Sequence, residues 1–350
     1  MTLSGEPTRK VRSQSELARH LGLSDWTVSR AINGHPAVKE STRKRVLKAM
    51  SELGFQSDPI ARGLRGKRTG LIGVLFNELC NSILLEKLAS FEHFLREHGL
   101  RTVLTFTAQD EAAELRAVAD FRRLRVDAVA LLQSTLSPAR SARTLAGLKS
   151  VHVDPMIPQN GPAAWVDRNR GVEFLIDHLV ALGHRRFGTL GINENNAWRQ
   201  PGLLKAFARH GLDPARHLKW YPPQDEMAPS YATGVYAAGQ VLADPERPSA
   251  LIAINDRVAL AAAQHLRAHG VDVPGECSVT GFDYLEISRH LHPTLTTIDH
   301  QPQLLMEAAG KLLLEQLEEN ATDQRAQPRV TPPLLIIGES TGPVRGKPNF

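Results

Sequence analysis

The stretch LSDWTVSRAINGHP, residues 23–36, places hydrogen-bonding side chains and an aromatic ring at the start of a short predicted helix. Ser24 is a favourable N-cap, and Asp25 in the first turn suits the positive end of the helix dipole. The helix is predicted to run from Asp25 to Asn33, because the following glycine and proline end it. Trp26 lies mostly outside the apolar face, so it either covers the rim of a small core or meets an external partner. The residues expected to pack inward are Val28, Ala31 and Ile32.

Two more short helices are predicted on either side of this one. Ser13 and Glu16 have the spacing of a capping box, in which each side chain satisfies a backbone amide of the other. The three-residue turn 22–24 joins the first two helices, which is the pattern of a helix-turn-helix. The second helix of that motif enters the DNA major groove with its N-terminal residues against base edges, so exposure of Trp26 is what the motif requires. The third helix has apolar residues at helical spacing, namely Val46, Leu47, Met50 and Leu53.

The distribution of charge favours a nucleic-acid partner independently. Residues 1–68 contain 14 Lys and Arg against 6 Asp and Glu, whereas the remaining 282 residues contain 28 against 31. The excess of positive charge therefore lies in the first fifth of the chain, as expected for a surface that neutralises phosphates. A solvated basic helix would explain the TRKRVLK segment but not the caps and the turn.

Composition bounds the class of protein. With 350 residues and 42% hydrophobic residues, the chain can bury a sizeable core in two or three domains. Cys80 and Cys277 lack metal-ligand spacing and suit a reducing compartment. There is no apolar signal core at the N-terminus and no apolar run near the roughly 20 residues that cross a bilayer. We expect a cytoplasmic protein.

From Thr69 onward, short apolar runs alternate with amphipathic helical stretches. This alternation predicts parallel sheets of the doubly wound type, with helices on both faces. Because the region is longer than one open sheet requires, we expect two α/β subdomains with a boundary near residues 161–167.

Polar residues follow many of the predicted strands. Ligands of open parallel sheets bind beyond the carboxyl ends of the strands, where these residues would gather. Each alone could be a cap or loop residue, but together they suit a polyhydroxylated or zwitterionic small molecule better than a reaction. They are Asn77, Glu78, Thr107, Ser134, Asp154, Asn193, Asn255, Asp256 and Asp283.

Several stretches in this order resemble the lactose/galactose repressor (LacI/GalR) family of bacterial transcription regulators: TVSRAING, STRKRVLKAMSELGF, DPIARGLRGKRTGLIGV, HLVALGHRRFGTL, NDRVAL, SVTGFDY and PTLTTI. The resemblance covers nearly the whole chain. It implies an all-α helix-turn-helix headpiece and an α/β core of two doubly wound parallel-sheet subdomains, like a periplasmic binding protein. It also implies a homodimeric repressor on a pseudo-palindromic operator, controlled by a small effector. The implied boundaries are 8–57 for the headpiece, 58–68 for a hinge helix, and 69–340 for the core, with an N-subdomain of about 69–163 plus 297–325 and a C-subdomain of about 164–296 plus 326–340.

The resemblance also assigns the DNA contacts. Asp25 and Trp26 would be the two specificity residues that open the recognition helix. Arg30 would reach a base or phosphate, since a bidentate contact to guanine is the commonest specific use of arginine. Asp25 can accept a hydrogen bond from cytosine but repels phosphate, so it would select by exclusion. The other implied contacts in the headpiece, mostly to phosphates, are Ser13, Gln14, Ser24, Thr27, Ser29, Asn33 and Thr42.

The segment DPIARGLRGK, residues 58–67, resembles the hinge helix of the family. Ala61 and Leu64 would enter the minor groove, where Leu64 would wedge into a base step, and Arg65 would add a phosphate or groove-edge contact. Its two glycines each cost a helix about 1 kcal/mol relative to alanine, so the helix would form only on DNA. A plain flexible basic linker is the alternative. Lys39 departs from the family, which usually has a serine cap there.

In the core, the resemblance implies an effector site. Asp256 and Asp167 match recurrent positions for which a structural role is equally open. Ile83 stands where many relatives have an aromatic residue, and an expected aromatic platform near residues 228–230 is missing. A purine effector is therefore not expected, and a sugar, sugar acid or sugar phosphate is the default, with no cofactor or metal. The implied effector-binding residues are Asn77, Ile83, Arg199, Asn255, Asp256 and Asp283.

The same residues bear on three other classes of function. An enzyme is not expected, because phosphate-loop and dinucleotide motifs are absent from the sequence and no nucleophile–base pair is indicated. A sugar-binding transport protein would have a secretion signal and no basic headpiece. A regulator of the same fold controlled by a protein corepressor remains an alternative.

Overall fold

The structure is a computed structural model of the 350-residue chain. The chain divides into two compact units, residues 1–71 with 122–127, and residues 72–121 with 128–350. The described residues are 11, 13–32, 37–55, 68–79, 81–223, 230–318 and 327–344.

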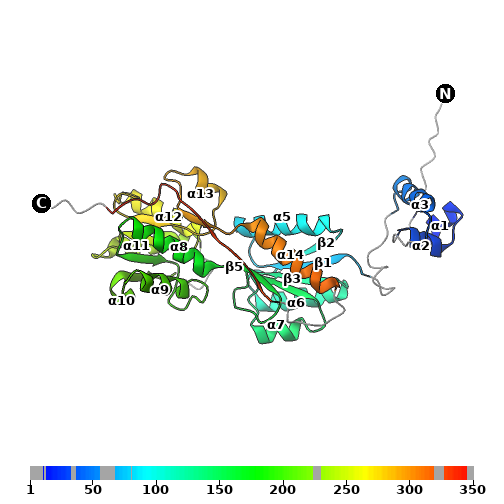
Figure 1. Ribbon diagram of the computed structural model, residues 1–350, viewed down its shortest axis with the longest axis horizontal. Coiled ribbons are helices and arrows are strands. Elements are labelled where there is room, and N and C mark those ends of the chain that lie inside the picture. The colour runs from blue at the N-terminus through cyan, green and yellow to red at the C-terminus, as the bar shows by residue number, and fades with distance from the viewer. Residues whose placement is uncertain are drawn as a thin grey trace, which may run out of the picture. The chain divides into compact units, whose positions relative to one another are not determined.

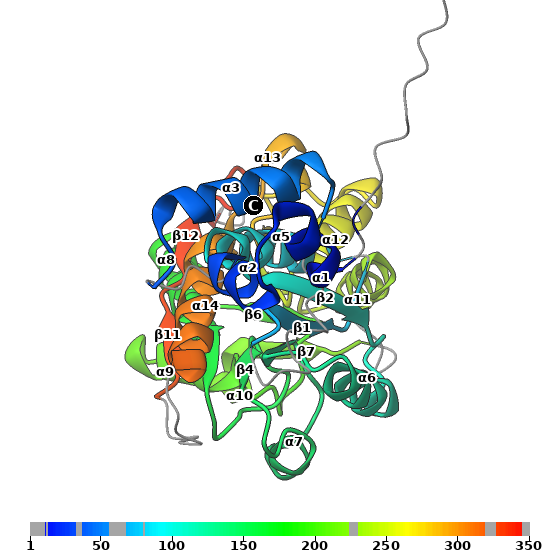
Figure 2. The same cartoon turned by 90° about the vertical axis from the view of Figure 1, so that its right-hand side faces the viewer.

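Three helices of the first unit pack around one small core (Figure 2). They are α1 (Gln14–Leu21), α2 (Asp25–Ile32) and α3 (Glu40–Glu52). The hydroxyl of Ser13 accepts the N–H of Glu16 at 3.1 Å, which caps α1, and Gly22 ends the helix at a positive φ of 63°. The helix-turn-helix prediction is confirmed. The buried apolar residues are Leu17, Ala18, Leu21, Val28, Ala31, Val46, Ala49 and Phe55.

One of the apolar residues at helical spacing in the third helix lies outside the core. Leu47 is 44% exposed, because Val46 and Ala49 supply the inward face of α3. Lys39 occupies the N-cap and its side chain makes no capping hydrogen bond.

The second unit begins with a six-stranded sheet of order β11-β5-β4-β3-β1-β2. The pairs β1–β3, β3–β4, β4–β5 and β5–β11 are parallel. Figure 1 shows α5 and α14 side by side against this sheet, and both contribute to its buried core. The strands are β1 (Leu71–Phe76), β2 (Arg101–Phe106), β3 (Ala128–Leu132), β4 (Ser150–Val153), β5 (Ala163–Val166) and β11 (Arg329–Thr331), and the helices are α5 (Ser82–Glu97), α6 (Glu111–Arg123), α7 (Pro138–Thr144) and α14 (Pro302–Glu318).

A four-stranded parallel sheet of order β7-β6-β8-β9 forms the second subdomain. Its core lies between the sheet and helices on its faces, with α8 and α9 on one side and α11 and α12 on the other. The strands are β6 (Phe187–Leu190), β7 (Leu218–Tyr221), β8 (Ala250–Ala253) and β9 (Ser278–Thr280), and the helices are α8 (Arg168–Ala181), α9 (Gln200–Arg209), α10 (Pro214–His217), α11 (Tyr231–Ala243), α12 (Asp256–Ala268) and α13 (Glu286–His290).

The chain crosses between the two sheets at three places. It passes from β5 to α8, from β10 (Thr297–Asp299) to α14, and from β11 to β12 (Leu334–Ile336), and β10 pairs antiparallel with β12. The expected return to the first subdomain after Thr297 is confirmed, because buried residues of α14 belong to the core of the first sheet.

Strand pairing corrects the expected subdomain boundaries. Residues 164–166 and 329–331 were assigned to the C-subdomain. Ala164 pairs with Arg329 and Val153, so both segments are strands of the first sheet. The first crossing therefore follows Val166, and the last follows Thr331.

Candidate functional site

The first turn of α2 presents an aromatic ring to solvent. Ser24 Oγ accepts the N–H of Thr27 at 3.1 Å and pairs with the Thr27 hydroxyl at 2.8 Å, which caps the helix as expected. Trp26 is 61% exposed, whereas Val28 is fully buried. The Arg30 guanidinium lies over the Trp26 ring, 3.7 Å from the ring centroid, in cation–π geometry. The exposed ring and the half-buried arginine lie together on the helix that this motif inserts into a major groove.

Asp25 has a structural partner as well as an exposed position. Its Oδ2 accepts a hydrogen bond from Ser15 Oγ at 2.6 Å, and its backbone oxygen accepts one from Gln14 Nε2 at 2.9 Å. These bonds join the starts of α1 and α2. Asp25 therefore holds the start of the recognition helix against α1, in addition to any contact that it makes with a base.

The remaining sequence-predicted DNA contacts divide into described and undescribed residues. Ser13 caps α1, Ser29 is half-buried within α2, and Thr42 is half-buried near the start of α3. The predicted contacts that lie outside the described residues are Asn33, Ala61, Leu64 and Arg65.

Within the second unit, a cavity of about 480 Å³ lies where strands of both sheets end. Asn77 follows β1, Arg199 precedes α9, and Asn255 follows β8 as the N-cap of α12. Two more predicted residues, Ile83 and Asp283, also line the cavity. Only some of the polar side chains expected beyond the strands therefore meet at this cavity. Thr107 and Ser134 are buried elsewhere, where their hydroxyls donate to the backbone oxygen of Phe76 and to the carboxylate of Glu114.

Asp256 does not line this cavity. Its carboxylate is fully buried and accepts hydrogen bonds from Ser288 Oγ at 2.6 Å, Thr297 Oγ1 at 2.5 Å and the N–H of Leu285 at 2.9 Å. Of its two open roles, the structure supports the structural one. Asp167 is likewise the N-cap of α8, accepting the N–H of Arg170 at 2.9 Å.

A buried ionic cluster beside the cavity was missed from the sequence. Lys87 Nζ lies 2.5 Å from Asp154 Oδ2 and 2.9 Å from His300 Nδ1. Arg168 Nη2 lies 3.0 Å from Asp154 Oδ1. Burial opposes ionisation of Asp154, but Arg168 and Lys87 outweigh it and hold the pKa of this carboxyl below its usual range. Burial and the charge on Lys87 lower the pKa of His300, which favours the neutral imidazole.

Two further ionisable groups, Asp283 and Arg199, line the cavity, and Asp283 Oδ1 lies 3.5 Å from His300 Nε2. Burial and repulsion from Asp256 raise the pKa of Asp283 to about 8, although Lys87 and Arg199 oppose the shift. Burial and the charge on Arg168 lower the pKa of Arg199 to about 9, which still leaves the guanidinium charged at neutral pH. Arg199 Nη2 donates to the backbone oxygen of Ile254 at 3.0 Å, and its guanidinium lies 4.7 Å from the centroid of Phe282.

One aromatic ring, that of Trp198, lies in the lining of the cavity. Trp198 donates from Nε1 to the backbone oxygen of Met156 at 3.0 Å and contacts Trp165 edge-on. A purine was not expected because Ile83 replaces an aromatic residue and a ring is missing near residues 228–230. Trp198 supplies a ring next to Arg199, so the lack of a ring no longer argues against a flat ligand. The tryptophan could have been found from the sequence, since it immediately precedes the predicted effector arginine.

Comparisons with known proteins agree with this arrangement. A family described as bacterial regulatory proteins of the lacI family matches residues 15–58, and a periplasmic binding protein-like domain matches residues 176–341. An uncharacterised helix-turn-helix transcriptional regulator of Streptomyces limosus is 30% identical over 343 residues, covering 95% of each chain. This chain belongs to the LacI family. Relatives found for it are named as transcriptional regulators or repressors and not as enzymes.

Two more LacI-family matches show how far the similarity extends. The transcriptional repressor PurR of Photobacterium profundum is 29% identical over 338 residues, covering 93% of this chain and 97% of its own. The crystal structure of the Lac repressor dimer bound to operator and the anti-inducer ONPF shares the fold, with a TM-score of 0.80 at 24% identity. It covers 94% of this chain and 99% of that chain. The chain is thus a DNA-binding transcription regulator with a helix-turn-helix and a periplasmic-binding-protein-like core, and its family typically represses.

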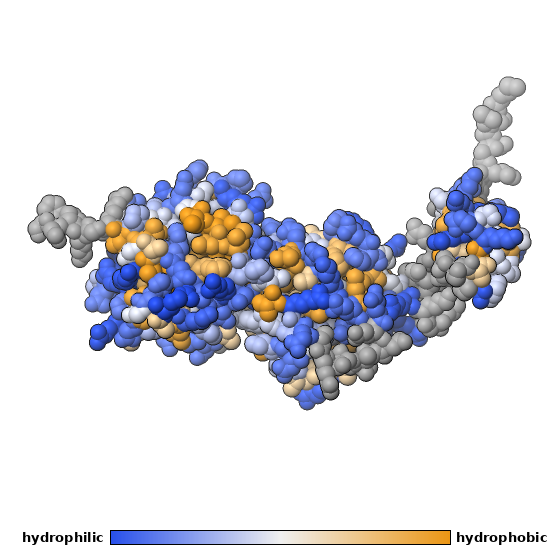
Figure 3. Space-filling model, viewed as in Figure 1, coloured by the Kyte–Doolittle hydropathy of each residue, from blue (hydrophilic) through white to orange (hydrophobic). Residues whose placement is uncertain are grey.

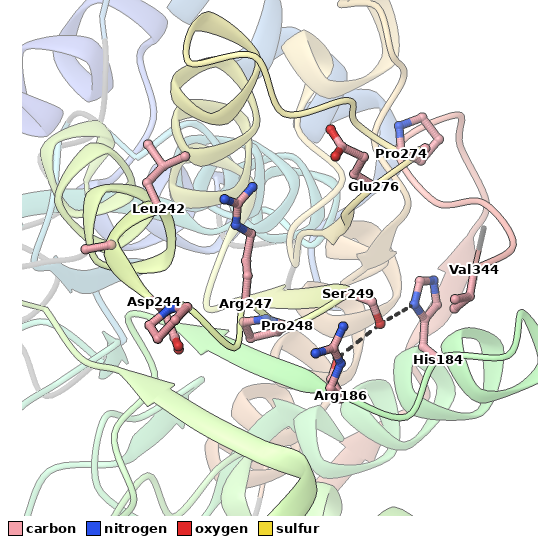
Figure 4. A pocket seen from close by; sticks show the side chains of 13 residues that line it. His184, Arg186, Leu242, Asp244, Arg247, Pro248, Ser249, Pro274, Glu276 and Val344 are labelled. Carbon is pink, nitrogen blue, oxygen red and sulfur yellow. Dashed lines mark hydrogen bonds between the residues drawn. The ribbon is translucent and has the colours of Figure 1, made fainter. Parts of the chain in front are cut away.

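This LacI-family core has another hollow, of about 620 Å³, at the opposite edge of the second sheet. Figure 4 shows Arg186 and Ser249, which flank the starts of β6 and β8, with Ser249 bonded to His184 at 2.9 Å. Lys219 and Tyr221 donate to the carboxylate of Asp244 here, at 2.8 and 2.6 Å. We call it the rear hollow, and the cavity beside Arg199 the cleft.

Two kinds of feature are absent from the described part of the chain. None of its helices is both long and apolar enough to span a membrane. Nor do its His, Cys, Asp and Glu side chains form a group of three or more that could hold a metal ion.

Proposed function

We propose that this chain is a repressor that binds a pseudo-palindromic operator as a homodimer, with its DNA affinity controlled by a small effector in the cleft. The headpiece of residues 8–57 would read the DNA, residues 58–68 would link it to the core, and residues 69–340 would bind effector and partner. Since its target is chromosomal DNA, we place its action in the bacterial cytoplasm. The observation that carries the proposal is the exposed ring of Trp26, stacked with Arg30, in the first turn of a capped recognition helix.

The headpiece geometry supports sequence-specific reading. An apolar core residue would be buried, yet Trp26 is exposed on a helix whose inward face is already filled by Val28 and Ala31. The indole face can contact a thymine methyl or sugar edge, and the stacked Arg30 can reach guanine. Stacking holds the arginine in one conformation, which lowers the entropy lost when it binds a base.

A homodimer is supported by apolar surface on the core. Leu85 on α5 and Leu104 and Phe106 on the edge strand β2 are exposed, as is Ile337 after β12. Figure 3 shows apolar patches on both subdomains in this view. Contiguous exposed apolar surface commonly marks a protein interface.

The cleft supports a sugar or sugar derivative as effector. Its amide side chains can pair with hydroxyl groups, and Trp198 can pack on a sugar ring. An effector that binds one arrangement of the subdomains better than the other would change DNA affinity through a coupling of typically 1–3 kcal/mol, about 5–150-fold.

The experiment selects duplexes for the full-length protein from a random library, then compares the selected duplex with a scrambled one. Trp26→Ala should weaken binding to the selected duplex by about tenfold or more, since one base-specific contact is worth ~1–3 kcal/mol, and should barely affect the scrambled one. Lys48→Gln is the control: this exposed lysine of α3 should affect both duplexes equally. Equal weakening by Trp26→Ala would show that the residue only packs or holds phosphate, and absence of any preferred symmetric duplex would overturn the proposal.

A further inference from the structure

Four cations lie in and beside the cleft, namely Lys87, Arg168, Arg199 and the partly exposed Arg257. Two carboxylates pair with them: Asp154 meets Lys87 and Arg168, and Glu78 lies 2.9 Å from Arg257. Asp256 and Asp283 are the remaining buried carboxyls, and burial raises the pKa of each. When one of these two acids is protonated, four cations face three anions, and a buried charge without a counter-charge is costly.

Two guanidinium groups that line the cleft have donor atoms without acceptors. Arg168 has 7% side-chain exposure and Arg199 is 9% exposed, so both are more than nine-tenths buried. Nη1 of Arg168 and Nε of Arg199 are buried and have no hydrogen-bond partner among the described residues. The same part of the chain places no carboxylate within 4.0 Å of Arg199, whose only side-chain hydrogen bond there is to a backbone oxygen. Buried donors normally have acceptors, so these two point to an acceptor that the described residues do not supply.

The rest of the cleft lining fits a polyhydroxylated molecule. The amide of Asn77 donates to the backbone oxygen of Gln133 at 2.7 Å, while its own Oδ1 is buried without a partner and can accept from a hydroxyl. The ring of Trp198 offers an apolar face 5.4 Å from the Arg168 guanidinium. Further amides that line the cleft are Gln109, Asn193, Asn195 and Asn196.

We propose that the ligand of the cleft is a sugar derivative carrying an anionic group, a carboxylate or a phosphate, and that Arg168 and Arg199 bind this group. The inference rests on the proposed effector role of the cleft. Guanidinium groups match carboxylate and phosphate oxygens by charge-assisted hydrogen bonds, and a neutral sugar would leave the surplus charge uncompensated. Arg168 begins α8 just after the first crossing, whereas Arg199 precedes α9 in the second subdomain. An anion between them would hold the start of α8 to the start of α9.

The test uses full-length protein and matched ligands: D-glucose with D-glucuronate and glucose 6-phosphate, and D-galactose with D-galacturonate and galactose 6-phosphate. Inorganic phosphate, compared with chloride at equal ionic strength, is the probe that needs no knowledge of the sugar. We expect phosphate to raise the melting temperature, and at least one acid or phosphate to bind about tenfold or more tightly than its neutral partner, because hydrogen bonds to charged groups are the strong ones. Preference for the uronate or for the sugar phosphate identifies the anionic group.

Variants locate the anion. Arg168→Gln and Arg199→Gln should each abolish the phosphate response and remove the preference for the charged ligand. Arg199→Lys keeps the charge and should retain part of the response, which guards against a variant that simply fails to fold. Arg186→Gln removes an exposed arginine of the rear hollow and should leave both responses unchanged.

Three results would overturn the proposal: a neutral sugar that binds as tightly as its charged partners, no stabilisation by phosphate or by any charged ligand, or anion binding that survives both Gln variants. DNA binding separates this failure from failure of the proposed function. If a neutral sugar changes affinity for the selected duplex, the effector role of the cleft stands and only the anion is wrong.

Discussion

The cleft and the rear hollow lie at opposite edges of one sheet and differ in how their charges are satisfied. The rear hollow is larger, about 620 Å³ against about 480 Å³. Its carboxylate Asp244 is satisfied by Lys219 and Tyr221, and its imidazole His184 by Ser249 and Ser278. In the cleft, the described residues place no carboxylate within 4.0 Å of Arg199, and Asp283 is buried near a second acid, Asp256, that raises its pKa. By volume alone, the rear hollow would be the better candidate for the ligand site. Buried polar groups without partners favour the cleft instead.

This contrast follows from where each group lies. Lys219 is 36% exposed at the side chain and Asp244 16%, so water shares the solvation of that pair. Lys87 and Asp154 are each 1% exposed, so only neighbouring groups can stabilise their charges. In the rear hollow, Arg247 Nε is the one buried side-chain atom of the described lining residues without a hydrogen-bond partner, and Arg247 is only half-buried. A folded chain tolerates an unmatched charge at a surface far better than in its interior.

Asp154→Asn in the cleft is the substitution expected to have the largest effect on stability. The substitution leaves Lys87 and Arg168 buried without their shared counter-charge, so we expect the free energy of unfolding to fall by about 3–5 kcal/mol. Urea denaturation at pH 7 measures it. A loss no greater than that of the same substitution at Asp244 would show that the cleft is not a region of concentrated buried charge.

Much of the fold could be predicted from the sequence because its signals are local. Caps, helical spacing and a short turn identify α1 and α2, and the alternation of strand and helix identifies parallel sheets. The strands β5 and β11 were misplaced because they have four and three residues and pair across more than 160 positions. Segments this short show no periodicity, and only the folded sheet decides to which subdomain they belong.

The sequence also predicted part of the candidate site. Asn255 and Asp283 follow strands, where parallel sheets bind ligands, so their position in the pattern predicted them, whereas Arg199 was assigned by the family resemblance. The cluster of Lys87, Asp154 and His300 joins residues 67 and 213 positions apart, and a linear sequence does not show such proximity. One local signal was present, since Lys87 lies one turn after Ile83 on the buried face of α5.

An intermediate effect is expected from Asp283→Asn. Burial and Asp256 raise the folded-state pKa of Asp283 to about 8, above its unfolded value near 4, so the folded protein binds the proton more tightly. The stability from this group is therefore fully present below about pH 4 and is lost as pH rises through 8. The variant stays neutral and should exceed the wild type in stability at pH 8 by at least about 1 kcal/mol, with a smaller difference at pH 5.

Unfolding by urea at pH 5, 6.5 and 8 resolves this difference between the two proteins. The same measurement can be repeated in phosphate. An anion bound to Arg199 weakens the attraction by which this arginine lowers the pKa of Asp283. The stability difference between Asp283→Asn and the wild type at pH 8 should therefore grow. Parallel stability curves for the two proteins across this range would mean that Asp283 ionises normally and that the cleft holds less surplus charge than inferred.

The smallest effect is expected in the rear hollow, from Asp244→Asn. Hydrogen bonds from Lys219 and Tyr221 lower the pKa of Asp244 to about 2, so the stability it contributes is present above about pH 4 and is lost as pH falls toward 2. Because the pair is partly exposed, the loss at pH 7 should be only about 1 kcal/mol, and it should shrink in 1 M salt. Asp154→Asn should keep its cost in the same salt, since ions do not screen a pair that water cannot reach. Equal salt sensitivity of the two substitutions would remove the distinction between an interior charge cluster and a surface one.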